Sequence, residues 1–278
     1  MDQPAAITRF PSRGLACPRG SVNAVVSGLA CAVRWAFEPS GAPGLARVRN
    51  SAACLLVAAL AAPAAYAARP FVTDDARLTT AGSCQVESWS RIYPSSTELW
   101  ALPACNPGGN FEVTAGGGLA RPDAASSSSD YVIQAKTLFR ALSPGGWGIG
   151  LAFGRVVHPE VNPGPNLLGN TYAYVPISVS MLDDRLVTHV NLGWLKDRAT
   201  REDRATWGVG GELRLDERWL GIAEIFGDNR NKPYTQVGTR FSLLSDLQVD
   251  ATLGAQFGGS SVNRWISFGL RYVPDKLW

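Results

Sequence analysis

The residue types that build catalytic and metal centres are scarce in this sequence of 278 residues. There are two histidines, His158 and His189, and they do not form a closely spaced pair. The sequence has no Gly-x-Ser-x-Gly motif, which would position a hydrolase nucleophile, and no Cys-x-x-Cys motif, which would indicate a zinc site. We therefore expect no cofactor, no metal ion and no enzymatic activity.

Charged residues are also few, at 18%, and the formal net charge of +3 comes mostly from the N-terminal quarter of the chain. Residues 1–67 contain six arginines, no lysine and two acidic residues, which leaves 20 basic against 21 acidic residues in the remainder. A nearly neutral chain has no basic surface of the kind that binds nucleic acid, so we expect no nucleic-acid partner.

The sequence lacks an apolar run long enough to cross a bilayer as a helix, which needs about 20 residues. The short apolar run 52–62 follows Arg47 and Arg49 and precedes Ala65-Tyr66-Ala67. This order is typical of a secretory signal peptide. We predict a signal peptide over 47–67 with cleavage after Ala67, a disordered, mis-assigned or extended N-terminus over 1–46, and one exported domain over 68–278.

Only two of the five cysteines, Cys84 and Cys105, remain after the predicted cleavage. An even pair in an exported chain suggests a disulfide, with two free thiols as the alternative. If the strands on either side of 94–96 form a hairpin, the two cysteines lie directly opposite each other. We therefore predict a disulfide between Cys84 and Cys105.

The chain is rich in glycine (29) and tryptophan (9), and it alternates polar and apolar residues over long stretches. The stretch 246–259, DLQVDATLGAQFGG, is typical: every second residue is apolar, which indicates a β-strand with two unlike faces. No helical periodicity competes. Twelve such strands are expected, near 83–93, 97–106, 110–120, 130–141, 147–158, 171–181, 186–196, 205–215, 218–227, 233–244, 247–258 and 263–273.

One alternating strand fits either a soluble sandwich or a membrane barrel, but the connections favour the barrel. Short connections follow the even-numbered strands, whereas most odd-numbered strands are followed by longer polar ones, such as 121–129, 159–170 and 196–205. This alternation is typical of outer-membrane barrels. We predict an all-β fold: a closed antiparallel transmembrane β-barrel of about 12 strands, in the bacterial outer membrane.

The polar faces of the strands carry ionisable residues near mid-strand, which a soluble fold would have to bury in its core at high cost. In a barrel these faces line the lumen instead. The near balance of acids and bases fits a structural salt-bridge network or a pore lining that sets selectivity, and both interpretations stay open. The predicted lumen-lining residues are Glu87, Arg91, Lys136, Arg140, His189, Asn191, Glu212, Arg214, Glu224, Arg240, Asp250 and Arg271.

Three fragments carry a resemblance to a known family: ARPFVTDDA (68–76), HVNLGW (189–194) and LGIAEIFGD (220–228). Together, and in this order, they resemble the phenol-degradation MetA-pathway family of outer-membrane transporters. The resemblance covers nearly the whole chain after the predicted signal peptide. It implies an outer-membrane barrel that passes small hydrophobic or aromatic compounds.

The predicted function is a passive, porin-like channel or transporter for small molecules. The alternative is a structural barrel whose loops bind partners without transport. An outer-membrane lipid hydrolase is a distant third, because His189 could meet a serine and Glu212 or Glu224 only on the lumen side. The partners we expect are outer-membrane lipid, the barrel-assembly machinery and a small-molecule solute.

Overall fold

The computed structural model describes residues 71–124, 127–157, 171–197 and 200–274. The predicted signal peptide with its cleavage after Ala67, His158 and the connection 159–170 lie outside these residues. The described part consists of β1 (Ser83–Tyr93), β2 (Ser96–Asn106), β3 (Phe111–Pro122), β4 (Ser128–Arg140), β5 (Trp147–Val157), β6 (Thr171–Met181), β7 (Leu186–Lys196), β8 (Asp203–Arg214), β9 (Trp219–Asp228), β10 (Tyr234–Ser242), β11 (Leu247–Gln256), the 3-10 helix η1 (Ser261–Asn263) and β12 (Arg264–Tyr272).

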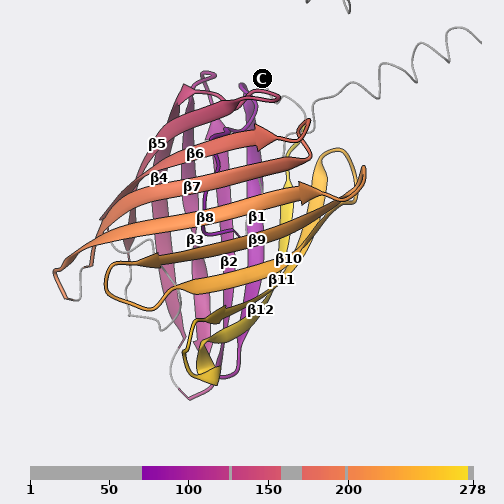
Figure 1. Cartoon of the computed structure of the whole chain (residues 1–278). Coiled ribbons are helices and arrows are strands. Elements are labelled where there is room, and N and C mark those ends of the chain that lie inside the picture. Colours follow the sequence, from indigo (N-terminus) through magenta and orange to yellow (C-terminus); the bar gives the residue numbers. More distant parts are fainter. Residues whose placement is uncertain (1–70, 125–126, 158–170, 198–199, 275–278) are drawn as a thin grey trace, which may run out of the picture. The chain divides into compact units, whose positions relative to one another are not determined.

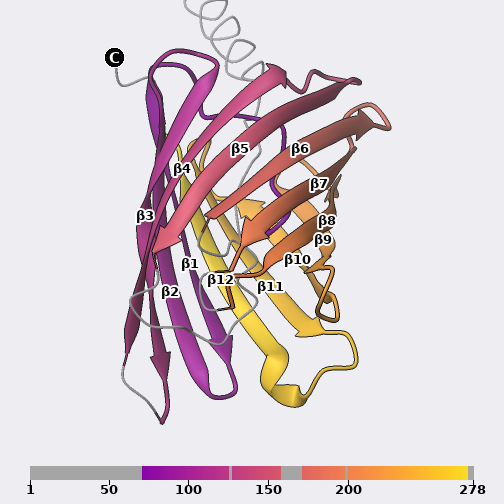
Figure 2. The ribbon, with the colours of Figure 1, turned by 90° about the vertical axis from the view of Figure 1, so that its left-hand side faces the viewer.

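The twelve strands form a closed antiparallel barrel (Figures 1 and 2). Each strand pairs with its neighbour in sequence, and β1 pairs with β12 to close the sheet. In Figure 1, β6 to β9 slope across the front of the barrel, while β1 and β2 stand more upright behind them. The predicted closed twelve-stranded antiparallel barrel is therefore confirmed, with strand bounds within two residues of those expected.

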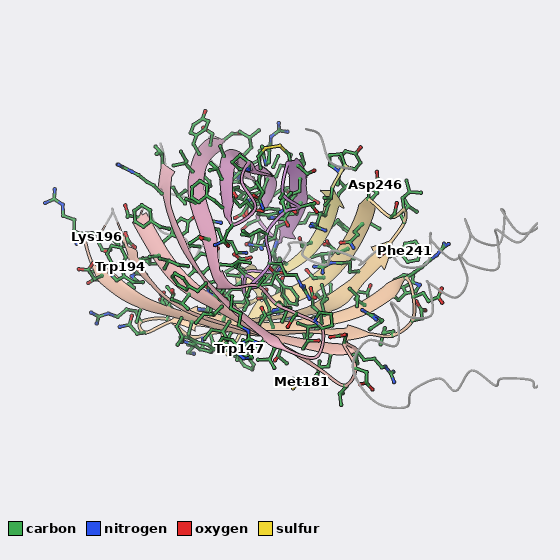
Figure 3. The ribbon with its side chains drawn as sticks, turned by 90° about the horizontal axis from the view of Figure 1, so that it is seen from above. Trp147, Met181, Trp194, Lys196, Phe241 and Asp246 are labelled. Carbon is green, nitrogen blue, oxygen red and sulfur yellow. A yellow bond between two sulfur atoms is a disulfide. The ribbon has the colours of Figure 1, made fainter. Side chains whose placement is uncertain are left out.

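The two faces of the wall are inverted relative to a soluble protein. The outer face carries the large apolar side chains, and Figure 3 shows Trp147, Met181 and Trp194 directed away from the barrel. On β11 and β12 the outward residues include Leu253, Ile266 and Phe268. The buried interior holds most of the ionisable side chains of the strands. Closing the sheet pairs the backbone groups that an open edge would leave unsatisfied.

Two prolines interrupt the pairing between neighbouring strands. Pro176 on β6 lies in a gap in the β5–β6 register, and Pro103 on β2 lies in a gap in the β2–β3 register. A proline has no N–H to give to a ladder, so pairing lapses on that side. The sheet still closes, because both prolines remain paired with the strand on their other side.

The connections differ from the expectation in one respect. Those at 123–127 and 197–202 are shorter than the predicted 121–129 and 196–205. The reason is that β3, β4 and β8 each extend two residues further toward that end. In the described part of the chain, the contrast between short turns and long loops is therefore weaker than the sequence suggests.

The predicted disulfide is present. Cys84 on β1 and Cys105 on β2 are register partners, with their Cα atoms 4.0 Å apart and their sulfur atoms bonded. Both lie near the end of the barrel where β1 begins and β2 ends. Within the described ranges, no helix has the length and apolar character needed to cross a membrane.

Candidate functional site

The structure places nearly all of the predicted lumen residues on the inner face of the wall. Arg240 and His189 are almost completely shielded from solvent, and Arg214, near the end of β8, is the only one of the inward set that is only partly buried. The inward-facing set is Glu87, Arg91, Lys136, His189, Asn191, Glu212, Arg214, Glu224, Arg240, Asp250 and Arg271.

Arg140, which we expected in the lumen, lies on the outside of the barrel. The β4–β5 register shifts between Leu138 and Arg140, so the alternation of side chains changes there. Arg140 is exposed, and its guanidinium lies 4.3 Å from the ring centroid of Trp147. A β-bulge reverses the side to which the following residues point. Counting alternate residues along the sequence cannot detect such a bulge.

The lumen contains a stretch of chain that the sequence analysis did not place there. Residues 71–82, the N-terminal segment, precede β1 and run inside the barrel rather than outside it. Phe71, Thr73, Asp75, Ala76 and Thr79 are buried. This segment has no regular secondary structure, so the wall must satisfy its backbone polar groups.

Side chains of the wall accept the N–H groups of the segment. The two carboxylate oxygens of Glu224 accept the N–H groups of Val72 and Thr73, at 2.8 and 2.7 Å. The Ser178 hydroxyl accepts from Ala76 N–H at 2.8 Å. Further along, the Glu112 carboxylate accepts from Thr79 N–H at 2.7 Å.

Other wall groups donate to the segment. The Asn106 amide donates to the Thr79 carbonyl at 2.7 Å, and the Leu142 N–H donates to the Ala76 carbonyl at 3.3 Å. With its amide oriented to satisfy both atoms, Asn191 accepts from the N–H of Asp74 at 2.6 Å and donates to its carbonyl at 2.8 Å. The segment is therefore held along its length by its main chain.

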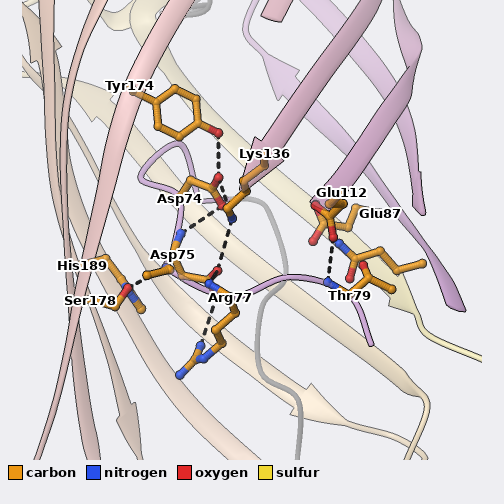
Figure 4. A network of polar contacts seen from close by, with 12 residues as sticks. Asp74, Asp75, Arg77, Thr79, Glu87, Glu112, Lys136, Tyr174, Ser178 and His189 are labelled. Carbon is orange, nitrogen blue, oxygen red and sulfur yellow. Dashed lines mark hydrogen bonds and ion pairs between the residues drawn. The ribbon is translucent and has the colours of Figure 1, made fainter. Parts of the chain in front are cut away.

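Ion pairs add to this main-chain recognition (Figure 4). Lys136 Nζ lies 2.9 Å from an Asp74 carboxylate oxygen and 3.6 Å from one of Asp75. The Tyr174 hydroxyl donates to Asp74 at 2.6 Å. A buried lysine between two carboxylates is stable only because its charge is compensated.

Arg77 extends the network to the other side of the lumen. Its guanidinium lies 3.2 Å from Asp75 and 3.3 Å from Glu212, and Glu212 also accepts from Arg240 at 2.7 Å. Burial alone would lower the pKa of Arg77, but the charges of Glu212 and Asp75 outweigh it and raise this pKa above its usual value. Arg77 therefore stays charged and joins the segment to β8.

Ser178, His189 and Glu212 lie on adjacent strands but serve to hold the segment. Ser178 Oγ lies 2.8 Å from His189 Nδ1, and His189 Nε2 lies 3.8 Å from Glu212. However, Ser178 is fully buried, and its hydroxyl already accepts the Ala76 N–H. A nucleophile must reach its substrate, so this geometry is that of an anchor for the segment.

A cavity of about 380 Å³ lies between the N-terminal segment and the wall of β1 to β4, with Tyr172 of β6 and Arg271 of β12 at its edges. Its lining is mixed polar and apolar, and the polar side chains from the wall include Gln85, Glu87, Lys136 and Arg271. Gln85 accepts two hydrogen bonds from Arg271, which also lies 3.8 Å from Glu87. In the described part of the chain, no group of His, Cys, Asp and Glu is arranged to hold a metal ion.

The segment left only a faint signal in the sequence. Asp74, Asp75 and Arg77 precede the first alternating strand and show no period of their own. The fragment 68–76 carried part of the family resemblance but did not indicate where the segment lies. On the wall, the mid-strand Lys136 has one carboxylate opposite it, Glu112, and a second carboxylate comes only from the segment. Tyr174 was also missed, because it reads as one more apolar residue of a strand.

The barrel is similar to solved porin structures. It matches a KdgM porin with a TM-score of 0.53 and 10% identity, over 68% of this chain and 98% of that chain. A KdgM porin in complex with disordered oligogalacturonate matches with a TM-score of 0.52, at the same identity and coverage. A NanC porin matches with a TM-score of 0.48. At this identity the likeness concerns the fold.

Curated proteins gave no significant match. The resemblance to the phenol-degradation MetA-pathway family stays a prediction. A different family model covers residues 54–272, which is most of the sequence and includes every strand of the barrel. This chain belongs to the family described as "Uncharacterised conserved protein UCP029691".

Proposed function

We propose that this protein is a porin-like channel of the bacterial outer membrane that passes small polar solutes. The observation that carries the proposal is the inversion of the wall, with large apolar side chains outside and ionisable side chains inside. Lipid can solvate the first set, and water or solute the second. The signal peptide predicted over 47–67 supports export to that membrane.

The chemistry of the lumen favours polar over hydrophobic solutes. Among the described residues, nine acidic and four basic side chains are buried. A surplus of acids attracts cations and repels anions. The oligogalacturonate of the KdgM complex is an acidic saccharide, so we expect this lumen to differ from that porin in selectivity. The charged inner face gives less support to the hydrophobic or aromatic substrates that the family resemblance implies.

A second candidate is a barrel without transport, and the N-terminal segment favours it. The segment fills part of the lumen and is held by ion pairs as well as hydrogen bonds. If it blocks passage completely, the protein acts through its loops or its lipid-facing surface. One experiment separates the two candidates: recording the current through single barrels in planar lipid bilayers.

For the channel, we expect discrete conductance steps that favour cations. Arg271→Gln removes a positive charge that lines the cavity and should strengthen the cation preference. Arg140→Gln is the matched control, because this arginine lies outside the barrel and should leave the reversal potential unchanged. No conductance from correctly folded protein would contradict the channel and favour the second candidate.

A further inference from the structure

We propose that the lumen wall is a binding site for an extended peptide, and that the N-terminal segment is its intramolecular occupant. The inference rests on the proposed channel function and names a substrate class for it: short peptides with an acidic pair followed two residues later by a basic residue. In this chain the occupant reads Phe71-Val72-Thr73-Asp74-Asp75-Ala76-Arg77-Leu78-Thr79.

The wall recognises main-chain atoms, which every peptide shares. Side chains of the wall accept the N–H groups of five residues of the segment. Three carbonyls of the segment also accept hydrogen bonds, two from side chains and one from the Leu142 N–H. The side chains that bind the main chain are Asn106, Glu112, Ser178, Asn191 and Glu224. They come from five strands, β2, β3, β6, β7 and β9, so the site surrounds the peptide.

Part of the surplus of buried acids follows from this role. Glu224 and Glu112 both accept N–H groups of the segment. A carboxylate that accepts main-chain N–H groups makes charge-assisted hydrogen bonds, which are stronger than neutral ones. Without a peptide in the lumen, Glu112 would lose the Thr79 N–H and Glu224 would lose two of its donors, keeping the Gln236 amide.

Side-chain contacts provide specificity. The acidic pair Asp74–Asp75 faces Lys136, and the Asp74 carboxylate also accepts from Tyr174. The later basic residue, Arg77, faces Glu212. Phe71 packs on Leu220 and Ile222 of β9, which places an apolar residue at the start of the motif. The wall therefore matches a charge pattern and not only a main chain.

Space beside the segment makes exchange with another peptide feasible. The cavity of about 380 Å³ runs along the segment from Asp74 to Ala81 and borders β1 to β4. Part of the segment therefore borders a cavity rather than packed side chains. Ion pairs and hydrogen bonds in such a place can be replaced by the same contacts from a second peptide.

The test uses purified, refolded barrel and a fluorescent synthetic peptide of sequence FVTDDARLT. In the full-length double variant Asp74→Asn/Asp75→Asn, the segment loses its ion pairs with Lys136, so an added peptide should displace it more easily. We expect the peptide to bind this variant at least 10-fold more tightly than it binds the wild-type barrel, measured by fluorescence anisotropy. The peptide FVTNNARLT should bind at least 10-fold more weakly. Equal binding of the two peptides would overturn the proposal.

Variants of the wall locate the site. In the same double-variant background, Lys136→Met should weaken binding of FVTDDARLT at least 10-fold. Lys196→Met is the control, since Lys196 pairs with Asp203 on the exposed end of the barrel. Each variant is shown to fold if heating changes its mobility in gel electrophoresis as much as it changes that of the wild type. Equal binding by both lysine variants would overturn the proposed location.

Single-channel recording separates this inference from the channel function. We expect the double variant to conduct more than the wild type, and added FVTDDARLT to block it. A variant that conducts but neither binds nor is blocked by the peptide would leave the channel standing and refute the peptide site. Binding without conductance in any variant would refute the channel and keep the site.

Discussion

At the scale of single residues, the side of the wall on which each strand residue lies determines whether it contacts lipid or the lumen. Leu253 on β11 is 59% exposed on the outer face, beside Val237 and Ile266 of the neighbouring strands. Leu253→Arg would place a charge in lipid at a cost of about 2–4 kcal/mol. We expect far less folded barrel in the membrane fraction, measured as the band in gel electrophoresis whose mobility changes when the sample is heated. Leu253→Phe should assemble normally, and equal loss in both variants would contradict a lipid-facing position.

Inside the barrel, glycines make room for aromatic rings. A Cβ atom added at Gly254 would lie 2.1 Å from two atoms of the Trp265 indole, which is buried against Tyr93. We expect Gly254→Ala to lower the free energy of unfolding by about 1–3 kcal/mol through overpacking. Gly211→Ala is the control, since its nearest neighbour would be 3.8 Å away. Urea unfolding in detergent measures both, and similar stability of the two would argue against the packing of Trp265.

At the scale of elements, the N-terminal segment depends on one buried lysine. Lys136→Met would remove the buried cation that pairs with both Asp74 and Asp75, and breaking a buried ion pair costs about 3–5 kcal/mol. We expect the amides of Thr73 and Ala76 to exchange hydrogen much faster, measured by mass spectrometry. Lys196→Met removes an exposed pair worth about 0–1 kcal/mol and should leave exchange unchanged. Slow exchange in both variants would mean that Lys136 does not hold the segment.

The β1–β2 hairpin depends on its disulfide. The Cys84–Cys105 bond closes a loop across a sequence separation of 21, and loops of this size contribute about 2–4 kcal/mol. The double variant Cys84→Ser/Cys105→Ser should unfold at a lower urea concentration than the wild type. Reduced wild-type protein should match the variant. A reductant that leaves the wild-type midpoint unchanged would show that the bond does not stabilise the barrel.

The elements also show what the sequence could and could not reveal. The alternation of polar and apolar residues along β11 and β12 predicts which side chains point outward. It does so because, within each strand, the apolar residues contact lipid and the polar residues face the lumen. The outward position of Arg140 and the path of the N-terminal segment were not predictable in this way. The first depends on a register shift against β5, and the second on contacts between residues more than 100 positions apart, such as Thr73 and Glu224.

At the scale of the whole molecule, closure of one sheet creates both the outer apolar face and the inner polar face. Closure satisfies the backbone, and the lumen gathers charges that pair across strands that are not neighbours in the sheet, as Arg240 on β10 and Glu212 on β8 do. The N-terminal segment completes this interior by supplying partners for Lys136 and Glu224. A barrel of this kind is stable in a membrane because lipid covers its outer face.

The most direct test is a nitroxide scan along β12 in lipid bilayers. Single cysteines at 265–270, in the background Cys84→Ser/Cys105→Ser, would each carry a spin label, and collision with oxygen reports contact with lipid. We expect a period of two, with high oxygen accessibility at Ile266, Phe268 and Leu270 and low accessibility at Trp265, Ser267 and Gly269. A scan with no alternation, or with the two sets reversed, would contradict the membrane barrel.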